Sequence, residues 1–150
     1  MSAENEKKAT DFCNSLKDGD LAIGVQYLSE DADYQNVGLS QSKGRAGVRE
    51  MLDEWVHGDN NMLTKMDIRH TASSGNIVMN ERLETWALNN VTIYLPVMGT
   101  FELNDEGMIC RWHDYMDSNV LEPLMTEMKK ARGVDSQFDD HLASRDSVPN

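Results

Sequence analysis

Apolar residues recur at helical spacing in the first third of the chain and in an extended pattern through its second half. The first of them are Phe12, Cys13 and Leu16. Their spacing predicts a helix that ends before Gly19. Asp20 can cap a second short helix whose apolar positions continue to Leu28. The chain is therefore expected to open with a helical hairpin.

A short strand and a third helix are expected next. Residues 32–37 alternate in polarity, which places Tyr34 and Asn36 on one face of a strand. The polar residues 40–44 are typical of a loop. From about residue 45 to residue 57 the apolar positions fit an amphipathic helix. These positions are Val48, Met51, Leu52 and Trp55.

Residues 62–117 form an extended region, divided into four long strands by turn signals. The turns are expected at 73–76, 89–90 and 104–107. Strands joined by such short turns make an antiparallel meander. A last helix is expected from about residue 119 to residue 130, with Pro123 near its start.

This order of elements predicts an α+β fold. A strongly curved antiparallel or mixed sheet would form a cone, and the N-terminal helices would close a deep apolar pocket. Residues 1–131 are expected to form a single catalytic domain, and residues 132–150 an acidic, mobile tail.

Composition narrows the possible partners and the compartment. The net charge of -12 repels nucleic acid and anionic membrane surfaces, so neither is expected to bind. The two cysteines form no metal-ligand or disulfide motif, which fits the cytoplasm. The N-terminus is polar and no run of about 20 apolar residues occurs, so a soluble, non-secreted protein is expected. No glycine-rich phosphate loop, GxSxG or HExxH motif is present, and no cofactor or metal is predicted.

Two strands place ionisable side chains where they could meet. One face of the strand at 76–88 carries Val78, Asn80, Arg82, Glu84 and Trp86. One face of the last strand carries Cys110, Trp112, Asp114 and Met116. A guanidinium can hold two carboxylates, so Arg82 could join Glu84 to Asp114. The pattern fits equally well with ordinary charges on the solvent side of a sheet.

Four segments resemble the limonene-1,2-epoxide hydrolase family in order and spacing. They are Tyr34-Gln35-Asn36, Glu81-Arg82-Leu83-Glu84, Leu95-Pro96-Val97-Met98-Gly99-Thr100-Phe101 and Trp112-His113-Asp114-Tyr115. The similarity covers roughly residues 11–121. It implies a cone-shaped fold of the SnoaL/NTF2-like superfamily and hydrolysis of an epoxide.

The resemblance also implies a role for each polar residue of the site. Tyr34 and Asn36 match the residues that hold the attacking water, and Asp114 matches the carboxylate that removes its proton. Arg82 matches the arginine that bridges the two acids. Glu84 stands where the family has an aspartic acid as general acid, and its carboxyl is one methylene further from the backbone.

Opening an epoxide by acid and base catalysis requires one ionised and one protonated carboxyl. In an apolar cavity, burial and like-charge repulsion would raise the pKa of one of the two acids, while the arginine would keep the other carboxylate ionised. The substrate is expected to contact the wall formed by Trp86, Trp112 and Met116. The histidines are weaker catalytic candidates. His113 lies on the opposite strand face from Asp114, and His57 ends a helix. His70 and His141 have no partner suggested by spacing.

Three functions remain open from the sequence. The first is an epoxide hydrolase that adds water in one step to an apolar terpenoid, steroid or polyketide-like substrate. The second is an isomerase or cyclase of natural-product biosynthesis, which the longer Glu84 side chain keeps open. The third is a non-catalytic dimeric binding module on the same fold. A homodimer is expected, because the outer sheet face around Leu83 would benefit from cover.

Overall fold

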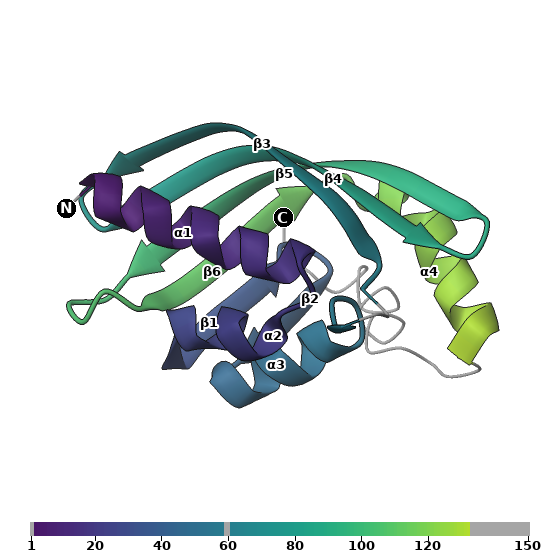
Figure 1. Ribbon diagram of the computed structural model, residues 1–150, viewed down its shortest axis with the longest axis horizontal. Coiled ribbons are helices and arrows are strands. Elements are labelled where there is room, and N and C mark those ends of the chain that lie inside the picture. The colour runs from purple at the N-terminus through teal and green to yellow at the C-terminus, as the bar shows by residue number, and fades with distance from the viewer. Residues whose placement is uncertain (1, 59–60, 133–150) are drawn as a thin grey trace.

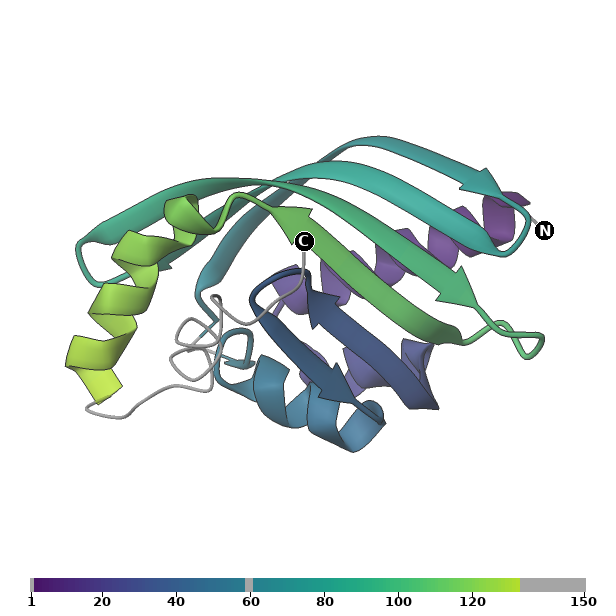
Figure 2. The same cartoon turned by 180° about the vertical axis from the view of Figure 1, so that it is seen from behind.

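A six-stranded sheet arches over the helices in the computed structural model, which describes residues 2–58 and 61–132 (Figures 1 and 2). Two short helical segments follow the first long helix, and a longer helix follows the last strand. The elements are α1 (Ser2–Lys17), α2 (Leu21–Gly24), the 3-10 helix η1 (Val25–Tyr27), β1 (Leu28–Asn36), β2 (Ser40–Lys43), α3 (Arg45–Asp53), β3 (Leu63–Ser74), β4 (Ile77–Leu88), β5 (Val91–Leu103), β6 (Ile109–Met116) and α4 (Ser118–Arg132). Most of the expected C-terminal tail lies outside the described residues.

The sheet is mixed, with strand order β2-β1-β6-β5-β4-β3. Strands β3 to β6 form the predicted antiparallel meander, whereas β1 pairs in parallel with β6. The turn between β4 and β5 has only two residues, and Asn89 adopts a φ of 52° there. Asparagine tolerates this left-handed conformation, which tight hairpins require. The α+β prediction is confirmed.

The helices cover the concave side of the sheet and bury its inward-facing residues. Helix α1 packs against β3 and β4, α3 against β1 and β2, and α4 against β5 and β4 (Figure 2). Phe12 of α1 meets the ring of Trp112 edge-on at a centroid distance of 4.8 Å. The same phenyl ring lies 6.3 Å from Phe101. This aromatic cluster fixes α1 over the middle of the sheet, next to the inward face of β6.

Three predicted boundaries were wrong near the N-terminal end of the sheet. Residues 40–43 form strand β2, because the turn at Val37–Leu39 folds them back along β1, where Ser40 pairs with Asn36. Leu28 begins β1 and does not extend the second helix. Helix α3 ends at Asp53, yet the next two apolar residues, Trp55 and Val56, stay buried. Pairing with β1 thus overrides the local polarity of residues 40–43.

Cys110 does not share the inward face of β6 as predicted. Leu103 of β5 pairs with Ile109, whereas Glu102 pairs with Arg111, so Cys110 is an extra residue in the ladder. Ile109 therefore takes the inward position and is buried. Such a bulge shifts the alternation of side chains by one residue. From residue 111 onward the predicted faces of β6 hold.

Candidate functional site

The guanidinium of Arg82 joins the two carboxyl groups on the concave face of the sheet. Its Nε donates to Glu84 Oε1 at 2.6 Å, and its Nη2 donates to Asp114 Oδ2 at 2.6 Å. The three residues retain only 2%, 5% and 3% of their exposed surface, in the order Arg82, Glu84, Asp114. The predicted cluster is thus buried and inward-facing, and the alternative of ordinary surface charges is wrong.

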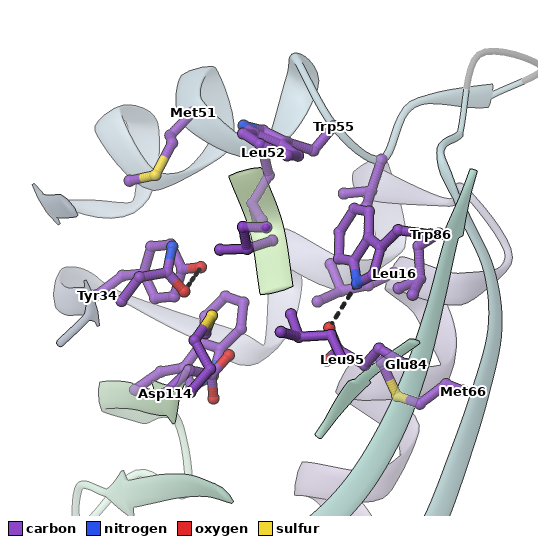
Figure 3. Close-up of a pocket in the computed structure, with 16 residues that line it drawn as sticks. Leu16, Tyr34, Met51, Leu52, Trp55, Met66, Glu84, Trp86, Leu95 and Asp114 are labelled. Carbon is purple, nitrogen blue, oxygen red and sulfur yellow. Dashed lines mark hydrogen bonds between the residues drawn. The ribbon is translucent and has the colours of Figure 1, made fainter. Parts of the chain in front are cut away.

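Each carboxyl receives a second hydrogen bond from a tryptophan on its own strand. Trp112 Nε1 donates to Asp114 Oδ1 at 2.8 Å, and Trp86 Nε1 donates to Glu84 Oε2 at 2.8 Å. Each tryptophan is two residues from its acid, so alternation along the strand puts both side chains on one face. Figure 3 shows the Trp86–Glu84 bond on one side of the pocket and Tyr34 on the other.

Asn80 and Gly99 complete the surroundings of the guanidinium. Arg82 Nη1 donates to Asn80 Oδ1 at 2.9 Å, and Asn80 is almost fully buried. Gly99 of β5 pairs with Asn80 on one side and with Asp114 on the other. A Cβ atom at position 99 would overlap Arg82 Nη1 and come within 2.9 Å of Asp114 Oδ1. The ion cluster therefore fits only because β5 carries no side chain at this point.

We expect Gly99→Ala to displace the guanidinium from Asp114. The added methyl should reduce activity at least about tenfold, because small displacements of catalytic groups cost large factors in rate. Overpacking should also cost about 1–3 kcal/mol of stability. Kinetic assays and thermal unfolding measure both effects. Thr100→Ala, on the opposite face of β5, is the control, and equal losses in the two variants would contradict the proposed crowding.

A second set of hydrogen-bonded polar side chains lies along β1 and β2. Tyr34 Oη donates to Asn36 Oδ1 at 3.0 Å, and Asn36 Nδ2 donates to Ser40 Oγ at 3.0 Å. Asn36 pairs with Asp114 across the parallel β1–β6 ladder, and Tyr34 pairs with Trp112. The rings of Tyr34 and Trp112 stack at a centroid distance of 3.9 Å. This register brings the predicted water-holding residues alongside the predicted base.

An apolar pocket opens in front of these polar groups (Figure 3). Tyr34, Asn36, Glu84 and Asp114 contribute its polar atoms, whereas Arg82 lies behind the two carboxyls. The remaining wall is made by Leu16, Met51, Leu52, Trp55, Val56, Leu63, Met66, Trp86, Leu95, Trp112, Met116 and Leu121. The structure thus brings all eight predicted site residues to one place, seven of them lining the pocket.

Burial and mutual charge shape the ionisation of this cluster. Burial raises the pKa of Asp114, Arg82 opposes that rise, and Glu84 adds to it. Burial disfavours the charge on Arg82, but Asp114 and Glu84 outweigh it and raise its pKa further. Burial, with both carboxylates nearby, also raises the pKa of Tyr34 well above its usual value. One arginine charge beside two buried carboxyls favours a state in which they share one proton.

The histidines lie away from this cluster. His113 faces the opposite side of β6, where its Nε2 lies 3.1 Å from Asp33 Oδ2. His70 contacts Glu81, and His57 contacts Asp53. His141 lies outside the described residues. Within residues 2–58 and 61–132, no three histidine, cysteine or acidic side chains gather as a metal site would require.

Sequence reasoning gave no role to three residues that support the site. Asn80 shares the predicted inward face with Arg82, and that alternation is a signal that could have identified it. Ser40 was assigned to a loop, so its contact with Asn36 was not foreseen. Gly99 lies within the segment that resembles the family, but only the pairing of three strands explains why it must be small.

The family model for the limonene-1,2-epoxide hydrolase catalytic domain matches residues 3–126. Epoxide hydrolase EphG of Mycobacterium tuberculosis (strain ATCC 25618 / H37Rv) is 27% identical over 106 residues, which are 71% of this chain and 68% of that protein. No helix in the described part of the chain is long and apolar enough to cross a membrane.

Two solved structures share the fold. An M. tuberculosis LEH-like epoxide hydrolase superimposes with a TM-score of 0.69 and 23% identity, covering 89% of this chain and 98% of its own. The epoxide hydrolase/cyclase-like enzyme SalBIII, which has a role in pyran ring formation in the polyether salinomycin, gives a TM-score of 0.68 and 17% identity. That match covers 79% of this chain and 94% of SalBIII. With the family model spanning most of its length, the chain belongs to the limonene-1,2-epoxide hydrolase family.

Proposed function

We propose that this protein is an epoxide hydrolase that adds water to its substrate in one step. The observation that carries the proposal is the bridge from Arg82 to two buried carboxyls, Glu84 and Asp114, at the wall of an apolar pocket. One shared proton gives this pair both a base and an acid at the same time. The need for a cofactor does not arise, because side chains supply both proton transfers.

The attacking water would lie between Tyr34, Asn36 and Asp114. The Tyr34 hydroxyl donates a hydrogen bond to Asn36 Oδ1, so either of these two oxygens can accept one proton of the water while the other proton points to Asp114. A water that donates its protons to oxygen acceptors keeps a lone pair free to attack carbon. As the new carbon–oxygen bond forms, Asp114 takes one proton from the water.

Glu84 would protonate the leaving oxygen as the carbon–oxygen bond of the epoxide breaks. The reaction consumes one water and yields a diol, leaving Asp114 protonated and Glu84 ionised. Return of one proton between the two carboxyls, directly or through solvent, restores the starting state. Arg82 contacts both carboxyls, so it stabilises whichever of them carries the charge.

The substrate class follows from the pocket wall. Leucine, methionine and tryptophan side chains make up most of the lining, and among the described residues its charged side chains are the acids Glu84 and Asp114. Such a surface favours an uncharged, apolar epoxide over an anionic one. Terpenoid, steroid and polyketide-like epoxides fit this description.

Single-turnover reactions in oxygen-18 water test the proposal directly. The product diol should carry one labelled oxygen, and mass spectrometry of the protein should find no label, because no covalent ester forms. A panel of terpenoid and steroid epoxides should include at least one that is hydrolysed. Label in a carboxyl of the enzyme would contradict the one-step mechanism.

An isomerase or cyclase is the second candidate. Two observations favour it: Glu84 is longer than the aspartic acid of the family, and SalBIII shares the fold. A substrate hydroxyl would then replace water as nucleophile, and Asp114 would remove its proton in the same way. Products that contain no solvent oxygen would support this reaction. A passive binding module is the weakest candidate, because burying three ionisable groups is costly without a chemical use.

We also propose that the protein is a homodimer through the outer face of its sheet. Exposed side chains of Met79, Tyr94, Met98 and Tyr115 lie there, and Met98 pairs with Tyr115 across the ladder. Burying such an apolar surface would stabilise a symmetric dimer. Sedimentation at micromolar concentration should give twice the monomer mass, and Met98→Glu should lower it. A wild-type monomer would contradict this proposal.

A further inference from the structure

The two hydrogen bonds between a tryptophan and an acid differ in their surroundings. Trp112 is 3% exposed, and its ring is packed by Tyr34, Phe12 and Phe101. Trp86 is partly exposed on the pocket wall and meets the ring of Trp55 edge-on at 5.8 Å. Both rings line the pocket, but the bond to Asp114 comes from a buried ring, whereas the bond to Glu84 comes from a partly exposed ring (Figure 3).

We propose that Trp86 is a positioning residue that orients the Glu84 carboxyl for proton donation. This inference rests on the proposed function. Arg82 binds one carboxyl oxygen and Trp86 binds the other, so the plane of the carboxyl is fixed. Each oxygen keeps one further lone pair, and the proton must occupy one of these two directions.

The longer side chain of Glu84 makes this second anchor necessary. A glutamic acid has one more rotatable bond than an aspartic acid, so a bond to the arginine alone would leave its outer oxygen free to turn. The indole N–H removes that freedom at a donor–acceptor distance of 2.8 Å. A fixed carboxyl keeps the proton aimed at one point in the pocket, which a general acid requires.

Removing the indole N–H would free one oxygen of Glu84 and leave the rest of the cluster in place. In Trp86→Phe the bonds from Arg82 to Glu84 and to Asp114 remain, because they do not involve the indole. Asp114 also keeps its bond from Trp112. The loss should therefore fall on the orientation of the acid and not on the base.

Steady-state kinetics of epoxide hydrolysis test this inference. Trp86→Phe should lower kcat about tenfold, because the carboxyl is less well oriented. The KM should change much less, because an aromatic ring still covers this part of the pocket wall. Thr85→Val, on the opposite face of β4 and outside the pocket lining, is the control and should change neither constant. An unchanged kcat in Trp86→Phe would overturn the inference.

A second measurement does not depend on turnover. The chain has three tryptophans, so nitrogen-15 labelling of tryptophan gives three indole N–H signals, and Trp86→Phe identifies one of them. Glu84→Gln should move that signal, because the acceptor of the indole N–H changes from a carboxyl to an amide, and should move the signal of Trp112 much less. A Trp86 signal that is unchanged in Glu84→Gln would overturn the inference even if epoxides are hydrolysed. If no epoxide reacts but the Trp86 signal moves, the proposed function fails and the contact between Trp86 and Glu84 stands.

Discussion

Asp114→Asn should lower the rate of epoxide opening by at least about a thousandfold, which corresponds to roughly 4 kcal/mol of barrier. An amide cannot accept the proton that the attacking water must lose. Both oxygens of Asp114 accept hydrogen bonds, from Arg82 and from Trp112, so the amide nitrogen must face one of these donors. We therefore also expect a loss of about 1–3 kcal/mol in stability. Steady-state kinetics and thermal unfolding measure the two effects.

The control for this variant must separate lost chemistry from lost structure. Asp33→Asn makes the same change at an acid of β1 that contacts His113 outside the pocket, and it should leave turnover near normal. Circular dichroism should show a native fold for Asp114→Asn below its unfolding temperature. Near-normal turnover in a folded Asp114→Asn protein would remove Asp114 as the base.

Substitutions of Glu84 should separate the acid itself from its position. Glu84→Gln removes the proton donor and should abolish turnover. Glu84→Asp keeps an acid but shortens its reach by roughly 1.5 Å, the length of one carbon–carbon bond. A misplacement of about 1 Å can cost on the order of a hundredfold in rate. Glu84→Asp should therefore retain partial activity, and kcat for both variants is the measurement.

The outcome for the aspartate variant also tests the role of the second anchor. The shorter carboxyl cannot keep both the Arg82 and the Trp86 bonds at their present lengths. Combining Glu84→Asp with Trp86→Phe should then cost less than the product of the two single effects, because the bond to Trp86 is already weakened. Full activity in Glu84→Gln would exclude Glu84 as the acid.

Alternation along strands made much of the site predictable from the sequence. Arg82 and Glu84 share a face at any register of β4, and Asp114 follows the same rule on β6. The sequence could not decide which face points inward, because helices far along the chain cover it. Distances between strands depend on register, which is why the roles of Gly99 and Ser40 appeared only with the fold.

Local signals failed where pairing with a distant segment decides the structure. The polar residues of β2 have no strand signature, and β1 supplies their hydrogen-bond partners. The bulge at Cys110 leaves no trace in the alternation of polarity around it. Cys110 was therefore assigned to the inward face of β6, which Ile109 occupies in the structure. In both cases the information lies in the neighbouring strand and not in the segment itself.

The division of the pocket between sheet and helices has a consequence for how this protein could evolve. All polar groups of the site come from strands, whereas Leu16, Met51, Leu52 and Leu121 come from helices. Substitutions on the helices can reshape the space for the substrate and leave the acid, the base and their arginine in place. A lineage can thus acquire new substrates through helix mutations while it retains one reaction. Laboratory selection for altered substrate scope should accumulate changes in the helices before any in β4 or β6.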